Sequence, residues 1–383
     1  MQFEFATANR ILFGPGTAAQ IPNLAARLGQ RVFVVTGSKE RSSTLVDGLL
    51  ASGLSVDLFE VNGEPDLDCV LMATRNSRKF GTQVVLGFGG GAVLDVGKAV
   101  AALLTNSGDL PDYLEVVGAG RALEKPSLPY VAVPTTAGTG SEVTRNAVIA
   151  VPEKRVKVSL RSPFMLPTYA IVDPELTVSL PPTVTASTGM DALTQLIEPF
   201  VCSTPTPLTD AICRDGIGRA ARSLGKAYEN GADVAARQEM ALASLYGGMA
   251  LANARLGAVH GLAGPIGGMS HGPHGAICAR LLPLVIETNL HALRTRQPGL
   301  PAIERYKEVA RILTGNGNAQ AEDAIFWVRQ LSEVLNIRPL SEYGLALGDF
   351  PALVEQSQKA SSMKGNPISL TDAELLSILT QAA

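Results

Sequence analysis

Short apolar runs alternate with segments of helical periodicity through the first half of the chain, and this alternation restricts the fold more than any other feature. The apolar runs have the length of buried strands and lie at 32–35, 56–61, 84–87, 130–133 and 170–172. Strands that alternate with helices form parallel sheets, because each helix carries the chain back across the sheet. We therefore predict an α/β, Rossmann-like domain with a parallel sheet over residues 1–180.

The composition changes after Pro181-Pro182, where Ala, Leu and Met recur with helical spacing. The clearest helical segments lie at 208–228, 238–254, 276–290, 303–313 and 321–335. This pattern predicts an all-helical second domain over residues 181–383. Gly247 and Gly248 stand inside one of these segments, which indicates close packing of a neighbouring helix.

Size and charge exclude some functions. The chain has 383 residues, 46% of them hydrophobic, which is enough to bury a core in each of two domains. The formal net charge is -3, and no cluster of basic residues interleaves with aromatic ones. A nucleic-acid-binding protein needs a positive surface for phosphate groups, so we expect no nucleic acid partner.

The sequence also indicates a compartment. The amino terminus lacks the basic start and apolar centre of a signal peptide, and the longest uncharged helical run, Met240–Ala254, is shorter than the roughly 18 residues of a membrane span. The four cysteines are scattered without a CxxC spacing, which argues against a zinc knuckle and a disulfide framework. We expect a cytoplasmic protein with no membrane partner.

Two polar loops follow predicted strands. Gly89, Gly90 and Gly91 follow the apolar run at 84–87, and a helix is expected to begin near Ala92. Such a junction between strand and helix offers free amides and the positive end of a helix to a dinucleotide pyrophosphate. A tight turn is the ordinary alternative. The second loop, 135–142, is rich in hydroxyl groups for phosphate or for the nicotinamide end of a cofactor, although such loops are often simple turns. Its candidate residues are Thr135, Thr136, Thr139 and Ser141.

A metal site is predicted in the helical half. Asp191 and Gln195 are four apart, so both project from one face of a helix. His260 and His274 stand in glycine-rich surroundings, and carboxylate with imidazole suits iron or zinc. The ordinary alternatives are a capping or ion-paired Asp191 and a hydrogen-bonded core histidine at 260.

Long motifs in this order resemble the iron-containing (group III) alcohol dehydrogenase family and cover nearly the whole chain. They are GGGAVLD, TTAGTGSEVT, AIVDPEL, GMDALTQLIEP, LGAVHG and PHG. The resemblance implies metal ligands at Asp191, Gln195, His260 and His274, where relatives have a histidine at the second position. It also implies cofactor contacts by Asp95 and Lys157, in addition to the two loops. Gly264 stands where many members carry a further histidine.

The resemblance implies an NAD(P)-dependent oxidoreductase that interconverts an alcohol and an aldehyde or ketone by hydride transfer, with a weakly held iron or zinc ion. A metal-independent keto-acid reductase of the maleylacetate reductase type is the nearest alternative, with His260, His271 or His274 donating to the carbonyl oxygen. A lyase like the dehydroquinate synthases and a non-catalytic nucleotide-binding protein are more distant alternatives.

Two further expectations concern the cofactor and the assembly. Relatives often carry Asp at the position of Gly37, where its carboxylate would repel a 2'-phosphate; Gly37, Ser38 and Lys39 therefore favour acceptance of NADP beside NAD. The resemblance also implies a homodimer, and residues Phe3–Ala6 look like an edge strand that could pair across a two-fold axis.

Overall fold

The computed structural model describes residues 2–383, which fold into two compact units. The α/β unit comprises Ala6–Thr136 and Gly140–Thr177. The helical unit comprises residues 2–5, Ala137–Thr139 and Val178–Ala383. The sequence placed a boundary between two domains after residue 180. That these parts are independent domains stays a prediction.

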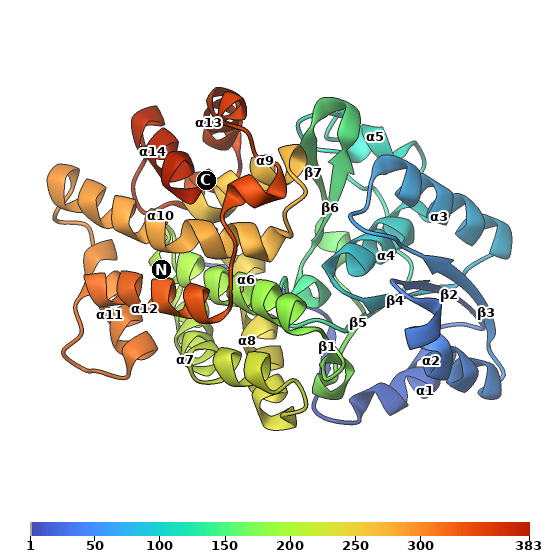
Figure 1. Cartoon of the computed structure of the whole chain (residues 1–383). Coiled ribbons are helices and arrows are strands. Elements are labelled where there is room, and N and C mark those ends of the chain that lie inside the picture. Colours follow the sequence, from blue (N-terminus) through green and yellow to red (C-terminus); the bar gives the residue numbers. More distant parts are fainter. Residues whose placement is uncertain (1) are drawn as a thin grey trace. The chain divides into compact units, whose positions relative to one another are not determined.

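Within residues 6–177, six parallel strands form one sheet in the order β1-β8-β5-β4-β2-β3 (Figure 1). The strands are β1 (Arg10–Phe13), β2 (Arg31–Thr36), β3 (Ser55–Glu60), β4 (Val84–Gly89), β5 (Tyr130–Pro134) and β8 (Tyr169–Val172). The prediction of a Rossmann-like parallel sheet is therefore confirmed. Lys157 lies on β7 (Val156–Arg161), a strand expected after the second polar loop, whereas the antiparallel pairing of β7 with β6 (Asn146–Val151) was not predicted.

Alternate residues of the central strands pack into two different cores, because successive side chains of a strand point to opposite faces of the sheet. Val32 and Val34 of β2 pack with residues of α1 (Ile21–Ala26) and α2 (Lys39–Ala51). Phe33 and Val35 pack with residues of α3 (Leu67–Phe80) and α4 (Gly91–Leu103). Helices thus cover both faces, which explains why these strands are continuous apolar runs.

Helices make up the regular structure of residues 178–383, with short 3-10 turns between some of them, as predicted. The helices are α6 (Pro182–Val201), α7 (Pro207–Glu229), α8 (Val234–Asn253), α9 (Ala258–Met269), α10 (His274–Arg296), α11 (Ala302–Thr314), α12 (Ala321–Val334), α13 (Phe350–Lys359) and α14 (Asp372–Ala382). Gly247 approaches α6 closely, because a Cβ there would lie 3.4 Å from the Ala192 carbonyl oxygen. The predicted close packing at this glycine is confirmed.

Helix α10 is the one helix among residues 2–383 that is long and apolar enough to cross a membrane. Helix α10 is longer than Met240–Ala254, the uncharged helical run that the sequence analysis compared with a membrane span. However, 78% of its apolar stretch is buried inside the structure, as in a core helix of a globular unit.

The predicted edge strand over Phe3–Ala6 is not assigned as a strand in this single chain. A strand is defined by its hydrogen-bonded partner, and the expected partner belongs to a second copy. Pairing across a two-fold axis therefore remains a prediction.

Candidate active site

Helix α6 supplies two buried carboxylates to the helical unit. Asp191 and Glu198 are seven residues apart, so they lie two turns apart on one face of the helix. Asp191 is 2% exposed and Glu198 is 4% exposed. Buried carboxylates need partners of opposite charge, hydrogen-bond donors or a metal ion.

Glu198 holds the start of α9 and orients His260. Its Oε1 accepts a hydrogen bond from the Val259 backbone N–H at 2.7 Å, and its Oε2 lies 2.6 Å from His260 Nδ1. Because a carboxylate accepts hydrogen bonds, Nδ1 carries a proton and donates a hydrogen bond to Glu198. In the neutral imidazole the other ring nitrogen, Nε2, therefore has the lone pair, and it faces Asp191 Oδ1 at 3.5 Å.

Helix α10 begins with His274, which lies close to Asp191 because the next residue is glycine. A Cβ on Gly275 would lie 2.1 Å from the Ser187 carbonyl oxygen, so only glycine permits this approach of α10 to α6. His274 Nε2 lies 3.8 Å from Asp191 Oδ1. One turn later, Cys278 places its Sγ 3.7 Å from His274 Nε2.

These four side chains form one cluster, hereafter the Asp191 cluster: Asp191, His260, His274 and Cys278. Their ligand atoms all lie within 4.8 Å of one another. The His274 side chain is 31% exposed, whereas those of Asp191 and His260 are 3% and 6% exposed. The cluster is thus buried on one side and accessible beside His274.

Two atoms of the cluster indicate that a cation belongs there. Neither Asp191 Oδ1 nor His260 Nε2 has a hydrogen-bond partner among residues 2–383, although both atoms are buried. Leaving a buried polar atom unsatisfied costs about 1–3 kcal/mol. With His260 neutral, these two acceptors face each other and repel, and a divalent metal between them would remove both costs. The residues present therefore fit a metal ion.

The electrostatics of the cluster favour a negatively charged Asp191 beside a positively charged imidazole. Burial raises the pKa of Asp191, but His274 and His260 more than offset it, so the pKa lies below its usual value. Burial lowers the pKa of His260, but Cys278 and Glu198 offset this and raise it well above its usual value. Protons therefore occupy imidazoles that a metal would need, and metal binding competes with protons.

The remaining predicted site residues of this unit lie in different surroundings. Gln195 donates from its amide nitrogen to the Thr139 carbonyl oxygen at 2.8 Å, which engages part of the side chain with the backbone. Gly264 borders open space, since a Cβ there would meet no atom within 4 Å. His271 is exposed in the connection between α9 and α10, outside the Asp191 cluster.

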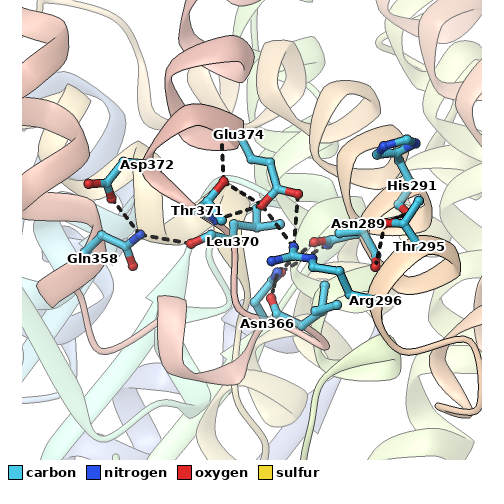
Figure 2. A network of polar contacts seen from close by, with 12 residues as sticks. Asn289, His291, Thr295, Arg296, Gln358, Asn366, Leu370, Thr371, Asp372 and Glu374 are labelled. Carbon is cyan, nitrogen blue, oxygen red and sulfur yellow. Dashed lines mark hydrogen bonds and ion pairs between the residues drawn. The ribbon is translucent and has the colours of Figure 1, made fainter.

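Asn366 ties the carboxyl-terminal segment to both α9 and α10. Its Oδ1 accepts from the Ala258 backbone N–H and from Asn289 Nδ2, both at 3.1 Å, and its Nδ2 donates to Asn289 Oδ1 at 2.7 Å. Figure 2 shows this amide pair and, further along the same segment, Glu374 against Arg296. These contacts fix the first turn of α9, which carries His260.

The predicted cofactor loops of the α/β unit lie at the carboxyl ends of neighbouring strands. Gly37 and Ser38 follow β2, Gly89–Gly91 connect β4 to α4, and Thr135–Thr136 follow β5. The chain passes from β2 to β3 on one side and to β4 and β5 on the other. Parallel sheets bind ligands outside such a switch point. Helix α4 has no side-chain cap there, so its first N–H groups are open to an anion.

Other predicted cofactor residues are engaged with the protein. Asp95 accepts hydrogen bonds from Ser141 Oγ at 2.6 Å and from the Val148 backbone N–H at 2.9 Å. Lys157 forms an ion pair with Glu64 at 3.1 Å. Asp95 and Ser141 thus join α4 to the loop after β5, and direct contacts of these residues and of Thr139 with a cofactor remain predictions.

Sequence reasoning missed three residues of the site. Glu198 was visible as a carboxylate two turns after Asp191, on the same face of the helix. Cys278 is a thiol one turn after His274, but the four cysteines lack the CxxC spacing that usually marks thiolate ligands in a sequence. Asn366 had no local signal, because its partners lie 77 and 108 residues away.

Comparisons with known proteins identify the family of the chain. The chain matches the models "Iron-containing alcohol dehydrogenase" over residues 8–174 and "Fe-containing alcohol dehydrogenase family, C-terminal" over residues 185–383. It is 35% identical over 332 residues to alcohol dehydrogenase 4 of Saccharomyces cerevisiae (strain YJM789), covering 86% of this chain and 84% of the yeast protein.

Solved structures of related proteins share the fold of the whole chain. A crystal structure of 1,3-propanediol oxidoreductase has a TM-score of 0.91 and 34% identity, covering 100% of both chains. Sulfoacetaldehyde reductase from Bifidobacterium kashiwanohense, in complex with NAD+, has a TM-score of 0.86 and 28% identity, covering 100% of this chain and 99% of that chain.

The fold, the site and these relatives define an enzyme that interconverts alcohols and carbonyl compounds. The chain belongs to the iron-containing alcohol dehydrogenase family, as its motifs indicated. The predicted nicotinamide cofactor and divalent metal are confirmed at the level of the family, by its description and by the NAD+ complex of a relative.

Proposed function

We propose that this enzyme uses NAD or NADP and a divalent metal held by Asp191, His260 and His274 to interconvert a small alcohol and its aldehyde or ketone. The observation that carries the proposal is the pair of buried acceptors, Asp191 Oδ1 and His260 Nε2, that face each other 3.5 Å apart. With His260 neutral, both buried atoms lack a donor, and a cation between them would satisfy both.

The protein's own groups prepare the site for this chemistry. When bound, the metal polarises the substrate oxygen as a Lewis acid and the nicotinamide carries the hydride. Asp191 contributes negative charge, and Glu198 holds His260 in the tautomer whose Nε2 lone pair is available. The partly exposed side of His274 provides access for the substrate oxygen. These roles argue against a purely nucleotide-binding protein.

Removal of the metal tests the proposal directly. After chelation, turnover of short alcohols, diols and aldehydes is expected to fall at least tenfold and to return when zinc or iron is added back. Net oxidation or reduction of the cofactor, followed by absorbance, separates this reaction from a lyase that regenerates NAD. Full activity in protein shown by elemental analysis to be metal-free would favour the keto-acid reductase in which His260, His271 or His274 donates the proton.

Acceptance of NADP is proposed from the loop after β2. Gly37 is exposed and lacks a carboxylate that would repel a 2'-phosphate, while Ser38 caps α2 and Lys39 adds positive charge. We expect kcat/KM values for NADP and NAD within about a hundredfold of each other, and Gly37→Asp should shift the ratio toward NAD by at least tenfold. Asn76→Asp, which adds the same charge at an exposed position of α3 in the same unit, is the control. A wild-type preference for NAD above a hundredfold would contradict the expectation.

We also propose a cytoplasmic homodimer with a small-molecule substrate. The exposed side chain of Phe3, with 46% of its surface accessible, supports a role of the amino-terminal segment in the dimer contact. Light scattering should give about twice the chain mass of 40.0 kDa. A monomer at micromolar concentration would exclude the dimer.

A further inference from the structure

We infer that Cys278 is the fourth protein ligand of the metal, and that its thiolate gives the site a preference for zinc over iron. This inference rests on the proposed metal-dependent function. It assigns the position that relatives fill with a histidine, where this chain has Gln195, to a residue on a different helix.

The first argument is the position of the thiol. Cys278 follows His274 by four residues on α10, so both side chains leave the same face of the helix. Cys278 is fully buried, and its Sγ belongs to the group of ligand atoms within 4.8 Å of one another. The thiol belongs to the apolar core of the helical unit, and its sulfur nevertheless lies within reach of the other ligand atoms.

The second argument is the spacing of the ligand atoms. Metal–ligand distances of about 2.0–2.3 Å in a tetrahedron place neighbouring ligand atoms roughly 3.3–3.8 Å apart. The separations from Asp191 Oδ1 to His260 Nε2 and to His274 Nε2 are 3.5 and 3.8 Å, and that from His274 Nε2 to Cys278 Sγ is 3.7 Å. Three of the six separations among the four ligand atoms thus match a tetrahedral set, and all six are within 4.8 Å.

The third argument concerns Gln195. Its amide nitrogen faces two carbonyl oxygens, those of Thr139 at 2.8 Å and Gly138 at 3.5 Å, which identifies the NH2 end of the amide. An amide NH2 group is a donor and has no lone pair for a metal, which leaves only the neutral amide oxygen of Gln195 as a weak metal donor. Cys278 offers a much stronger donor for the fourth position once it is deprotonated.

The donor set determines the preferred metal. One carboxylate, two imidazoles and one thiolate form a softer set than one carboxylate and three imidazoles, and thiolates favour zinc. Two negative ligands also neutralise a divalent ion, which stabilises it in a buried site. Zinc is further expected to bind more tightly than iron(II) at such sites on the general order of divalent affinities. We therefore expect zinc to displace iron(II) at equal concentration.

Cobalt substitution tests the ligand. Wild-type protein loaded with Co2+ is expected to show a thiolate-to-cobalt charge-transfer absorption in the near ultraviolet. Cys278→Ser should lose this absorption and bind metal at least 10-fold more weakly. Cys69→Ser, at a half-buried cysteine of the α/β unit, is the matched control and should keep both properties.

X-ray absorption of the zinc-loaded wild type supplies a test that needs no variant. One sulfur at about 2.3 Å beside nitrogen and oxygen ligands near 2.0 Å would support the inference even if Cys278→Ser did not fold. Tight binding of metal without a sulfur neighbour would overturn the role of Cys278 while leaving the metal-dependent function in place. Failure of active wild-type protein to bind any metal would overturn both.

Discussion

Replacement of Glu198 by glutamine is expected to lower metal affinity by roughly 10–100-fold, the usual effect of losing a group that orients a metal ligand. Glu198 receives two hydrogen bonds, from the Val259 N–H and from His260 Nδ1. Glutamine has a single acceptor atom, so its NH2 group must face one of these partners. If it faces His260, it favours the tautomer that protonates Nε2 and removes the lone pair.

Zinc titration against a competing chelator measures this change, and imidazole nitrogen chemical shifts report the tautomer of His260. Glu287→Gln, at a half-exposed ion pair with Arg329 on the surface of the same helical unit, is the matched control and should leave both measurements unchanged. An affinity within twofold of wild type for Glu198→Gln would show that this carboxylate does not orient the ligand.

Replacement of Gly275 by alanine is expected to destabilise the protein by about 1–3 kcal/mol, the usual cost of forcing extra volume into a packed interface. The new Cβ would lie 2.1 Å from the Ser187 carbonyl oxygen and 3.0 Å from Asp191 Cβ. The start of α10 must therefore move away from α6, and it carries His274 with it. Metal affinity should fall in the same variant, because the ligand spacing depends on this contact.

Urea unfolding and zinc titration measure the two effects of Gly275→Ala. Gly225→Ala is the matched control, because Gly225 is also helical and a Cβ there meets no atom within 4 Å. That substitution should stabilise the protein by about 0.5–1 kcal/mol through higher helix propensity. Wild-type stability and wild-type zinc affinity in Gly275→Ala together would contradict the proposed close contact.

Much of the fold followed from the sequence because the signals are local. Apolar runs with strand length and segments with helical period are read from neighbouring residues, and Pro181-Pro182 marks the change to helices. The antiparallel pairing of β6 with β7 was not predicted, because an apolar run such as 147–151 shows that a strand forms but not which strand it pairs with.

The site was predictable only where residues stand within a motif. Asp191, His260 and His274 were found from their residue types and from motifs that resemble a known family, and the structure brings these three together. The ligand roles of Gln195 and Cys278 could not be ranked from sequence, because the choice depends on which group each side chain faces. Gln195 lies on the helical face that the spacing predicts, yet its amide nitrogen is bonded to Thr139.

The sequence by itself determined the order of strands and helices, the glycine loops and three residues of the Asp191 cluster, because each depends on short-range periodicity or on a contiguous motif. The tertiary structure alone decided that Cys278 joins the Asp191 cluster, that Glu198 binds His260 through Nδ1 and that Asn366 holds the first turn of α9. These roles depend on distances of a few ångströms between helices, and side-chain packing rather than local propensity fixes such distances.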